Sequence, residues 1–157
     1  MPAEANMVDV SFLSLMVPHH KQAVEMSSIV LAAEGISEHT RDLAQRIADQ
    51  QQVEIEYMDG LATDWNQEEI MRSHAEHLSM GMVSRDQMDQ LRNSTGPVME
   101  EVFLRLMYIH HEGAIGGMDN LMKNGGYIPL RDLVKNMKSC QLEEMDEMVE
   151  MLGYDPV

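Results

Sequence analysis

A nine-residue motif occurs twice in this chain, each time ending in two adjacent histidines. "FLSLMVPHH" occupies residues 12–20 and "FLRLMYIHH" occupies residues 103–111. Alanine follows three residues beyond the second histidine in both copies, at Ala23 and Ala114. Such a repeat indicates a chain built from two related units, so its fold must accommodate an internal duplication.

The spacing of apolar residues within each copy predicts a helix. Between residues 10 and 33, these positions recur at alternating steps of four and three, the period of a buried helix face. They are Phe12, Met16, His19, Ala23, Met26 and Val30. Residues 97–123 follow the same period with Phe103, Met107, His110, Ala114 and Leu121. No stretch alternates with the period of a strand, so the chain is predicted to be all-α.

A second helix is predicted in each unit, over about 38–63 and 130–152. Both contain Arg-Asp-Leu, then Gln-x-x-Glu, then methionine: Gln51, Glu54 and Met58 in one, Gln141, Glu144 and Met148 in the other. One helical hairpin cannot bury its apolar face alone, whereas two form a four-helix bundle with pseudo-twofold symmetry.

The units are predicted to make a single domain over residues 1–157. Hairpins over about 10–63 and 97–152 are joined by a crossing segment, about 64–96. This segment is predicted to contain short helices near 67–79 and 84–93, because Asn66 with Glu69 and Ser84 with Gln87 match capping boxes.

The charge of the chain excludes several classes of partner. It carries 27 acidic and 11 basic residues, for a formal net charge of −16, which disfavours nucleic acid and anionic membranes. No apolar run has transmembrane length, and "MPAEANMVDV" lacks the features of a signal peptide. The single cysteine, Cys140, excludes a disulfide framework and is more typical of a small buried thiol than of a copper ligand.

Polar residues on the predicted inner faces allow two interpretations. His19, His110 and the paired glutamines and glutamates point inward, with His20 and His111 beside them. In the structural interpretation each histidine bonds the glutamine or glutamate of its neighbouring helix, because a buried unsatisfied group costs roughly 1–3 kcal/mol. In the functional interpretation the same groups form a metal site, with glutamate as a ligand or as the group that orients one.

The spacing around the histidines favours a soft metal. Di-iron carboxylate bundles need Glu-x-x-His, and none of the seven histidines has glutamate three residues before it. Methionine stands there instead in Met16–His19, Met71–His74 and Met107–His110. That spacing puts a thioether and an imidazole on one helix face, which suits Cu(I) or Ag(I). Methionine also fills irregular cores, and this chain contains 17 of them.

The crossing segment carries a second candidate set. "MRSHAEHLSMGM" places Met71, His74, His77 and Met80 at steps of three, followed by Met82. Because their neighbours are polar, this ridge is predicted to be exposed, where methionine gains little from packing. The alternative is a short amphipathic helix that covers the bundle and leaves its histidines in solvent.

With these motifs assembled, the chain resembles the domain of unknown function family numbered 305, which includes CopM-type copper-binding proteins. The resemblance covers roughly residues 9–152 and rests on Phe-x-x-x-Met-x-x-His-His-x-x-Ala and Gln-x-x-Glu-Ile-x-x-Met. It implies a ferritin-like helical bundle, metal handling in some members, and a location outside the cytoplasm. Two departures are Gly117, with Met118 one residue after the usual methionine position, and Met145 in place of isoleucine.

The predicted function is non-catalytic sequestration or transfer of Cu(I), or of Ag(I), by a periplasmic or secreted protein. Zinc or no metal, a purely structural bundle and, less favoured, a metalloenzyme remain as alternatives. A metal-delivery partner protein is compatible with this function. The predicted ligands are His19, His20, His110, His111, Met16, Met107, Met26, Met71, His74, His77, Met80 and Met82. Gln51, Glu54, Gln141, Glu144, Met58 and Met148 are predicted to orient them or to join them.

Overall fold

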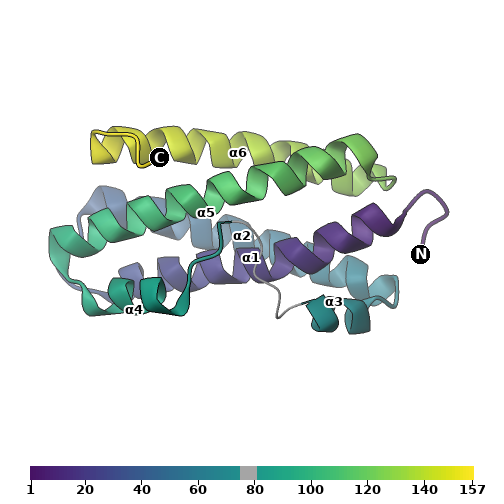
Figure 1. Cartoon of the computed structure of the whole chain (residues 1–157), viewed down its shortest axis with the longest axis horizontal. Coiled ribbons are helices and arrows are strands. Elements are labelled where there is room, and N and C mark those ends of the chain that lie inside the picture. The colour runs from purple at the N-terminus through teal and green to yellow at the C-terminus, as the bar shows by residue number, and fades with distance from the viewer. Residues whose placement is uncertain (75–80) are drawn as a thin grey trace.

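The computed structural model describes residues 1–74 and 81–157, apart from the side chain of His74. The helices of this part are α1 (Met7–Ala32), α2 (Glu38–Asp64), α3 (Glu68–His74), α4 (Arg85–Asn93), α5 (Gly96–Asn124) and α6 (Ile128–Leu152). Figure 1 shows the long helices α1, α2, α5 and α6 side by side, with α3 and α4 near opposite ends. The described residues include no strand, and the all-α prediction is confirmed.

The helix ends follow from local sequence. Asn6 and Asp9 form a capping box at the start of α1, and Ser84 and Gln87 form the one predicted for α4. Ser37 caps α2 through its hydroxyl, and a proline lies in the first turn of α5 and of α6. The helix predicted near 67–79 is present as α3 up to His74, and residues 75–80 lie outside the description.

The long helices pack as two hairpins, α1 on α2 and α5 on α6, and α1 also packs along α5. Buried apolar side chains fall into two clusters. One contains Leu13, Met58 and Leu121, and the other contains Met26 and Phe103. In sequence, the paired histidines of α1 and α5 lie between the members of the two clusters. The core is therefore apolar toward both ends and polar in its middle.

Two carboxylates tie each hairpin to the other. Asp9, in the first turn of α1, accepts hydrogen bonds from the backbone N–H groups of Gly126 (3.0 Å) and Tyr127 (3.2 Å), just before α6. Glu100, at the equivalent position of α5, accepts one from the N–H of Ser37 (2.5 Å), just before α2. Contacts exchanged between equivalent positions are what a pseudo-twofold axis requires.

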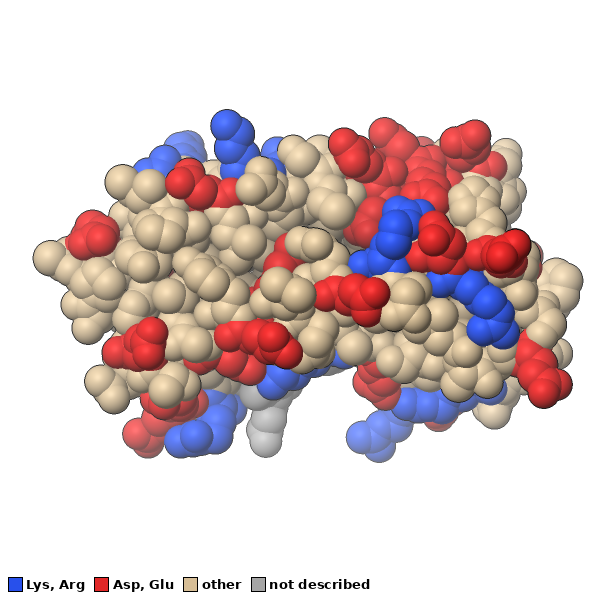
Figure 2. Space-filling model, turned by 180° about the vertical axis from the view of Figure 1, so that it is seen from behind, with Lys and Arg blue, Asp and Glu red and all other residues tan. Residues whose placement is uncertain are grey.

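Acidic side chains outnumber basic ones on the surface, in keeping with the net charge of −16. Figure 2 shows them gathered most densely at the upper right of the face drawn, the end where α6 finishes. The last turns of α6 carry Glu143, Asp146, Glu147 and Glu150. None of the helices in the described ranges is both long and apolar enough to cross a membrane.

Candidate metal site

The polar middle of the core, called the polar layer below, is made of the buried side chains of His19, His20, Gln51, Glu54, His110, His111, Gln141 and Glu144. At its centre is a pair of stacked imidazoles. The rings of His19 on α1 and His110 on α5 have centroids 3.6 Å apart and planes inclined by 26°. Both residues are buried, with 2% of His19 and none of His110 exposed. The prediction that both inner histidines lie in the core is thus consistent with the structure, which also brings them together from the two repeats.

The second histidine of each pair bonds the glutamate of its own hairpin. Nε2 of His20 lies 2.8 Å from Oε1 of Glu54, and Nε2 of His111 lies 3.0 Å from Oε1 of Glu144. All of these residues are buried. Gln50 donates a further hydrogen bond of 3.0 Å to Oε2 of Glu54. The two glutamates therefore fix the second histidines, which the helical periodicity had placed only beside the inner face.

Several buried polar atoms of this layer have no hydrogen-bond partner among the described residues. They include both ring nitrogens of His110 and Nδ1 of His20 and of His111. Oε1 of Gln51 and Oε1 of Gln141 share this property. Each such atom costs free energy unless a ligand or an ordered water bonds it. Imidazole nitrogens with free lone pairs and amide oxygens are groups that can coordinate a cation.

His110 is held in its neutral form. Burial, followed by the proximity of His19, His111 and His20, lowers the pKa of His110 well below its ordinary 6.5. Only the neutral ring has a lone pair available for a metal. The environment of His110 therefore keeps that lone pair available at neutral pH.

The predicted methionines lie around this layer. Met16 and Met107, three residues before the stacked histidines, are buried at 4% and 0% exposure. Met26, Met107 and Met148 belong to one apolar cluster, and Met16 and Met58 to the other. A Cβ added at Gly117 of α5 would lie 3.8 Å from Cε of Met16, so this methionine reaches toward the opposite hairpin.

The structure describes only some of the predicted metal ligands of the crossing segment. Met71 is half-buried and packs against the cluster that contains Met16, so it is not the freely exposed residue that the sequence predicts. Met82 is half-buried as well. His77, Met80 and the side chain of His74 lie outside the described residues.

The end of the crossing segment is fixed beside the stacked histidines, a feature that sequence reasoning missed. The N–H of Val83 donates to Oε1 of Gln22 (2.7 Å), and Nε2 of Gln22 donates to the carbonyl of Val83 (2.8 Å). Gly81 has a φ of 79°, and a Cβ there would lie 2.6 Å from the carbonyl oxygen of Ile109. Only glycine fits this approach to α5, one residue before His110.

In the part of the chain that the structure describes, histidine, cysteine and carboxylate side chains do not assemble a metal site without other donors. Among the described residues, no group of three or more His, Cys, Asp and Glu side chains is arranged to hold a metal ion. Cys140 is half-buried in a groove between α2 and α6, where burial and then Glu144 and Glu54 raise the pKa of its thiol to about 11. The remaining donors that suit a soft cation are the imidazoles together with methionine sulfurs.

Solved structures with the same architecture are known. A DUF305 protein from Streptomyces coelicolor, whose description proposes that it is secreted, matches with a TM-score of 0.82 and 25% identity over 99% of this chain and 98% of that chain. A DUF305 fragment from Deinococcus radiodurans gives a TM-score of 0.81 and 26% identity over 95% and 97%.

CopM is a third similar structure. In its Cu(II)-bound form it gives a TM-score of 0.74 and 25% identity over 92% of this chain and 95% of that chain. It has also been solved in a Cu(I)-bound form. A search of the curated proteins finds no match. The sequence model of the family described as "Domain of unknown function (DUF305)" matches residues 9–152, so the chain belongs to this family.

Proposed function

We propose that this protein binds Cu(I) through the histidines and methionines that α1 and α5 bring together. The observation that carries the proposal is the buried stack of His19 on His110, in which neither nitrogen of His110 has a hydrogen-bond partner among the described residues. Met16 and Met107 precede these histidines by one helical turn on the same faces. Thioether and imidazole ligands together select soft cations such as Cu(I) and Ag(I).

Each part of the layer has a separate role in this proposal. His19 and His110 supply nitrogens, and Met16 and Met107 supply sulfurs. Glu54 and Glu144 hold His20 and His111 in place, as groups behind metal ligands commonly do. Met26, Met58, Met148, Gln51 and Gln141 border the layer and limit its access to water. His74, His77, Met80, Met71 and Met82 would add ligands from the crossing segment.

The protein acts in this account as a store or carrier and not as an enzyme. A CopM structure with bound copper, 25% identical over 92% of this chain, supports the choice of metal. We place the protein outside the cytoplasm, because the Streptomyces coelicolor neighbour is described in these terms and because thioethers remain usable where thiols oxidise. A carrier of this kind would hand its cation to a partner protein.

A second candidate function has its own observation. The pairs His20–Glu54 and His111–Glu144 are complete hydrogen-bonded contacts that would order the core without any metal. In that case the layer would serve only to fix the register of the two hairpins, and the protein would be a structural or interaction module.

Purification under defined copper, zinc and iron separates the two. A Cu(I)-binding protein should retain copper and compete with a calibrated Cu(I) chelator, and a His19→Ala/His110→Ala variant should lose this ability. His39→Ala is the matched control, because His39 is an exposed histidine in the first turn of α2 that bonds Glu147. Binding of zinc without measurable Cu(I) binding would reject the proposal.

A further inference from the structure

The two ends of the bundle are built from equivalent positions of the repeats, but different side chains cover them. At the end where α1 begins, Trp65 follows α2 and packs edge-on against Tyr127, with ring centroids 5.1 Å apart. Trp65 is only 4% exposed and belongs to the same apolar cluster as Val10 and Leu130. This end is closed by an aromatic side chain that the chain itself supplies.

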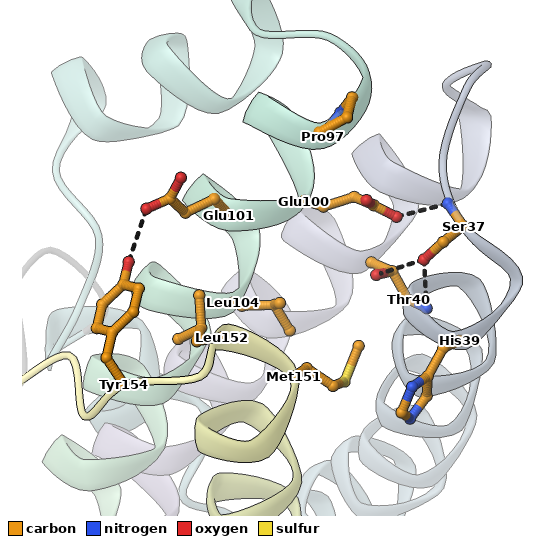
Figure 3. A pocket seen from close by; sticks show the side chains of 10 residues that line it. All are labelled: Ser37, His39, Thr40, Pro97, Glu100, Glu101, Leu104, Met151, Leu152 and Tyr154. Carbon is orange, nitrogen blue, oxygen red and sulfur yellow. Dashed lines mark hydrogen bonds between the residues drawn. The ribbon is translucent and has the colours of Figure 1, made fainter.

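The equivalent end, where α5 begins, is open. A cavity of about 350 Å³ lies between the start of α2, the start of α5 and the end of α6 (Figure 3). Leu104, Met151 and Leu152 provide apolar contacts, and Ser37 and Thr40 line it from α2. Tyr154 stands on the opposite side from Ser37. Pockets of roughly 300 Å³ and more are the size that small molecules occupy.

Different amino acids at equivalent positions of the two repeats explain why one end is closed and the other is open. Val10, fully buried at the closed end, corresponds to the exposed Glu101 at the open end. Tyr127 corresponds to Ser37, and the buried Leu130 corresponds to Thr40. Tyr154 follows α6 much as Trp65 follows α2, but it is 41% exposed where Trp65 is 4% exposed, so it does not close this end. The open end thus keeps the apolar floor of the closed end but has polar, acidic walls.

Two carboxylates, Glu100 and Glu101, line this pocket, and the guanidinium of one cation, Arg105, lies near the hydroxyl of Tyr154 beside them. Burial alone would raise the pKa of Glu100, but hydrogen bonds from Ser37 and Thr40 bring it below its ordinary value, so its carboxylate is ionised at neutral pH. Oε1 of Glu101 accepts a hydrogen bond of 2.7 Å from the hydroxyl of Tyr154. The acidic side chains of Figure 2 are densest at this same end of the molecule. An anionic ligand would be repelled here and a cation attracted.

We propose that this pocket binds a small organic cation in which a primary ammonium group is attached to an aromatic or apolar body. The body would lie on Leu104, Met151 and Leu152, the apolar side chains of the pocket. The ammonium group would face the carboxylates of Glu100 and Glu101. This site is separate from the histidine layer and does not depend on the proposed copper binding.

Tryptamine is the probe, because it joins an indole to an ammonium group. We expect saturable 1:1 binding by NMR titration, with shifts confined to the pocket. Neutral 3-methylindole should bind more weakly, and anionic indole-3-acetate should not bind. Glu101→Gln should weaken tryptamine about fivefold, the effect of removing one partly exposed ion pair. The matched control Glu112→Gln, which removes an exposed charge elsewhere on α5, should leave the affinity unchanged.

Met151→Trp provides a second variant, designed to fill the pocket from within. It should abolish tryptamine binding. If this bulkier variant fails to fold, Glu101→Gln still tests whether tryptamine binds in the pocket. The proposal is overturned by the absence of saturable binding up to about 10 mM tryptamine, a concentration beyond the affinity of any specific site of this size. It is overturned equally if indole-3-acetate binds as tightly, or if Glu101→Gln and Glu112→Gln have the same effect.

Discussion

His19 and His110 occupy equivalent positions of the two repeats, and their rings stack on each other with centroids 3.6 Å apart. A contact between equivalent residues lies on the pseudo-twofold axis that relates the repeats. Duplication of one Met-x-x-His-His sequence thereby brings two equivalent histidines together in the core, with Met16 and Met107 one helical turn away in different apolar clusters. One hairpin alone presents only half of this set.

Removing either buried glutamate should destabilise the fold. Glu54→Ala leaves Nε2 of His20 without its partner, and Glu144→Ala does the same for His111. Each change should lower the free energy of unfolding by roughly 1–3 kcal/mol, measured by urea denaturation of the metal-free protein. Glu56→Ala, an exposed neighbour on α2, should stay within about 0.5 kcal/mol. Equal effects at Glu54 and Glu56 would contradict the buried pair.

Asp9 should be the more costly of the two carboxylates that join the hairpins. It is fully buried and accepts hydrogen bonds from the backbone N–H groups of Asn6, Gly126 and Tyr127. Asp9→Ala should lower the free energy of unfolding by about 3 kcal/mol, because several buried donors lose their acceptor. Glu100→Ala, at a half-buried residue, should cost less. Thermal melts with the exposed Asp89→Ala as control test this order, and a neutral Asp9→Ala would refute it.

The metal-free protein should lose stability as the pH falls from about 6.5. The pKa of His110 in the folded protein lies well below 6.5 because of burial and of its neighbouring histidines, whereas the unfolded chain has the ordinary value. Below 6.5 the unfolded state therefore takes up a proton that folded His110 does not, and protonation favours unfolding. NMR titration of the histidine rings, with urea denaturation at each pH, checks this. A folded His110 that titrates at or above 6.5 would count against it.

His74 and His77 of the crossing segment should contribute to copper stoichiometry without contributing to stability. If His74 and His77 are exposed ligands, replacing both with alanine should lower the number of Cu(I) ions bound and change the free energy of unfolding by less than about 0.5 kcal/mol. A Cu(I) titration beside a thermal melt measures both. Should the double variant keep full stoichiometry while His19→Ala and His110→Ala lose metal, the doubled motif would be the only metal site.

Much of the fold was accessible from local sequence patterns. The spacing of Phe12, Met16 and His19 predicts the face of α1 that is buried, and Ser84 with Gln87 predicts the start of α4. Helical periodicity and caps depend on residues a few positions apart, which a sequence displays directly. The duplication adds the expectation that His19 and His110 lie at similar depth.

The rest depends on contacts between distant residues. Helical periodicity places His20 beside the buried face of α1. Its hydrogen bond to Glu54 depends on how α1 packs on α2, which periodicity does not give. The two hydrogen bonds between Gln22 and Val83 and the close contact of Gly81 with α5 cannot be predicted from neighbouring residues in the sequence. The difference between the two ends follows from where Trp65 and Tyr154 lie after their helices finish, beyond the repeated motifs.

Cu(I) titration against a calibrated chelator, with wild type and His19→Ala/His110→Ala compared at equal folded concentration, tests the central claim most directly. The account predicts that wild type competes for Cu(I) far more strongly than for Zn(II). The double variant should lose at least one Cu(I) equivalent while circular dichroism still shows a helical fold, and His39→Ala should behave as wild type. If the double variant is folded and binds Cu(I) with unchanged stoichiometry and affinity, the stacked histidines are not the metal site.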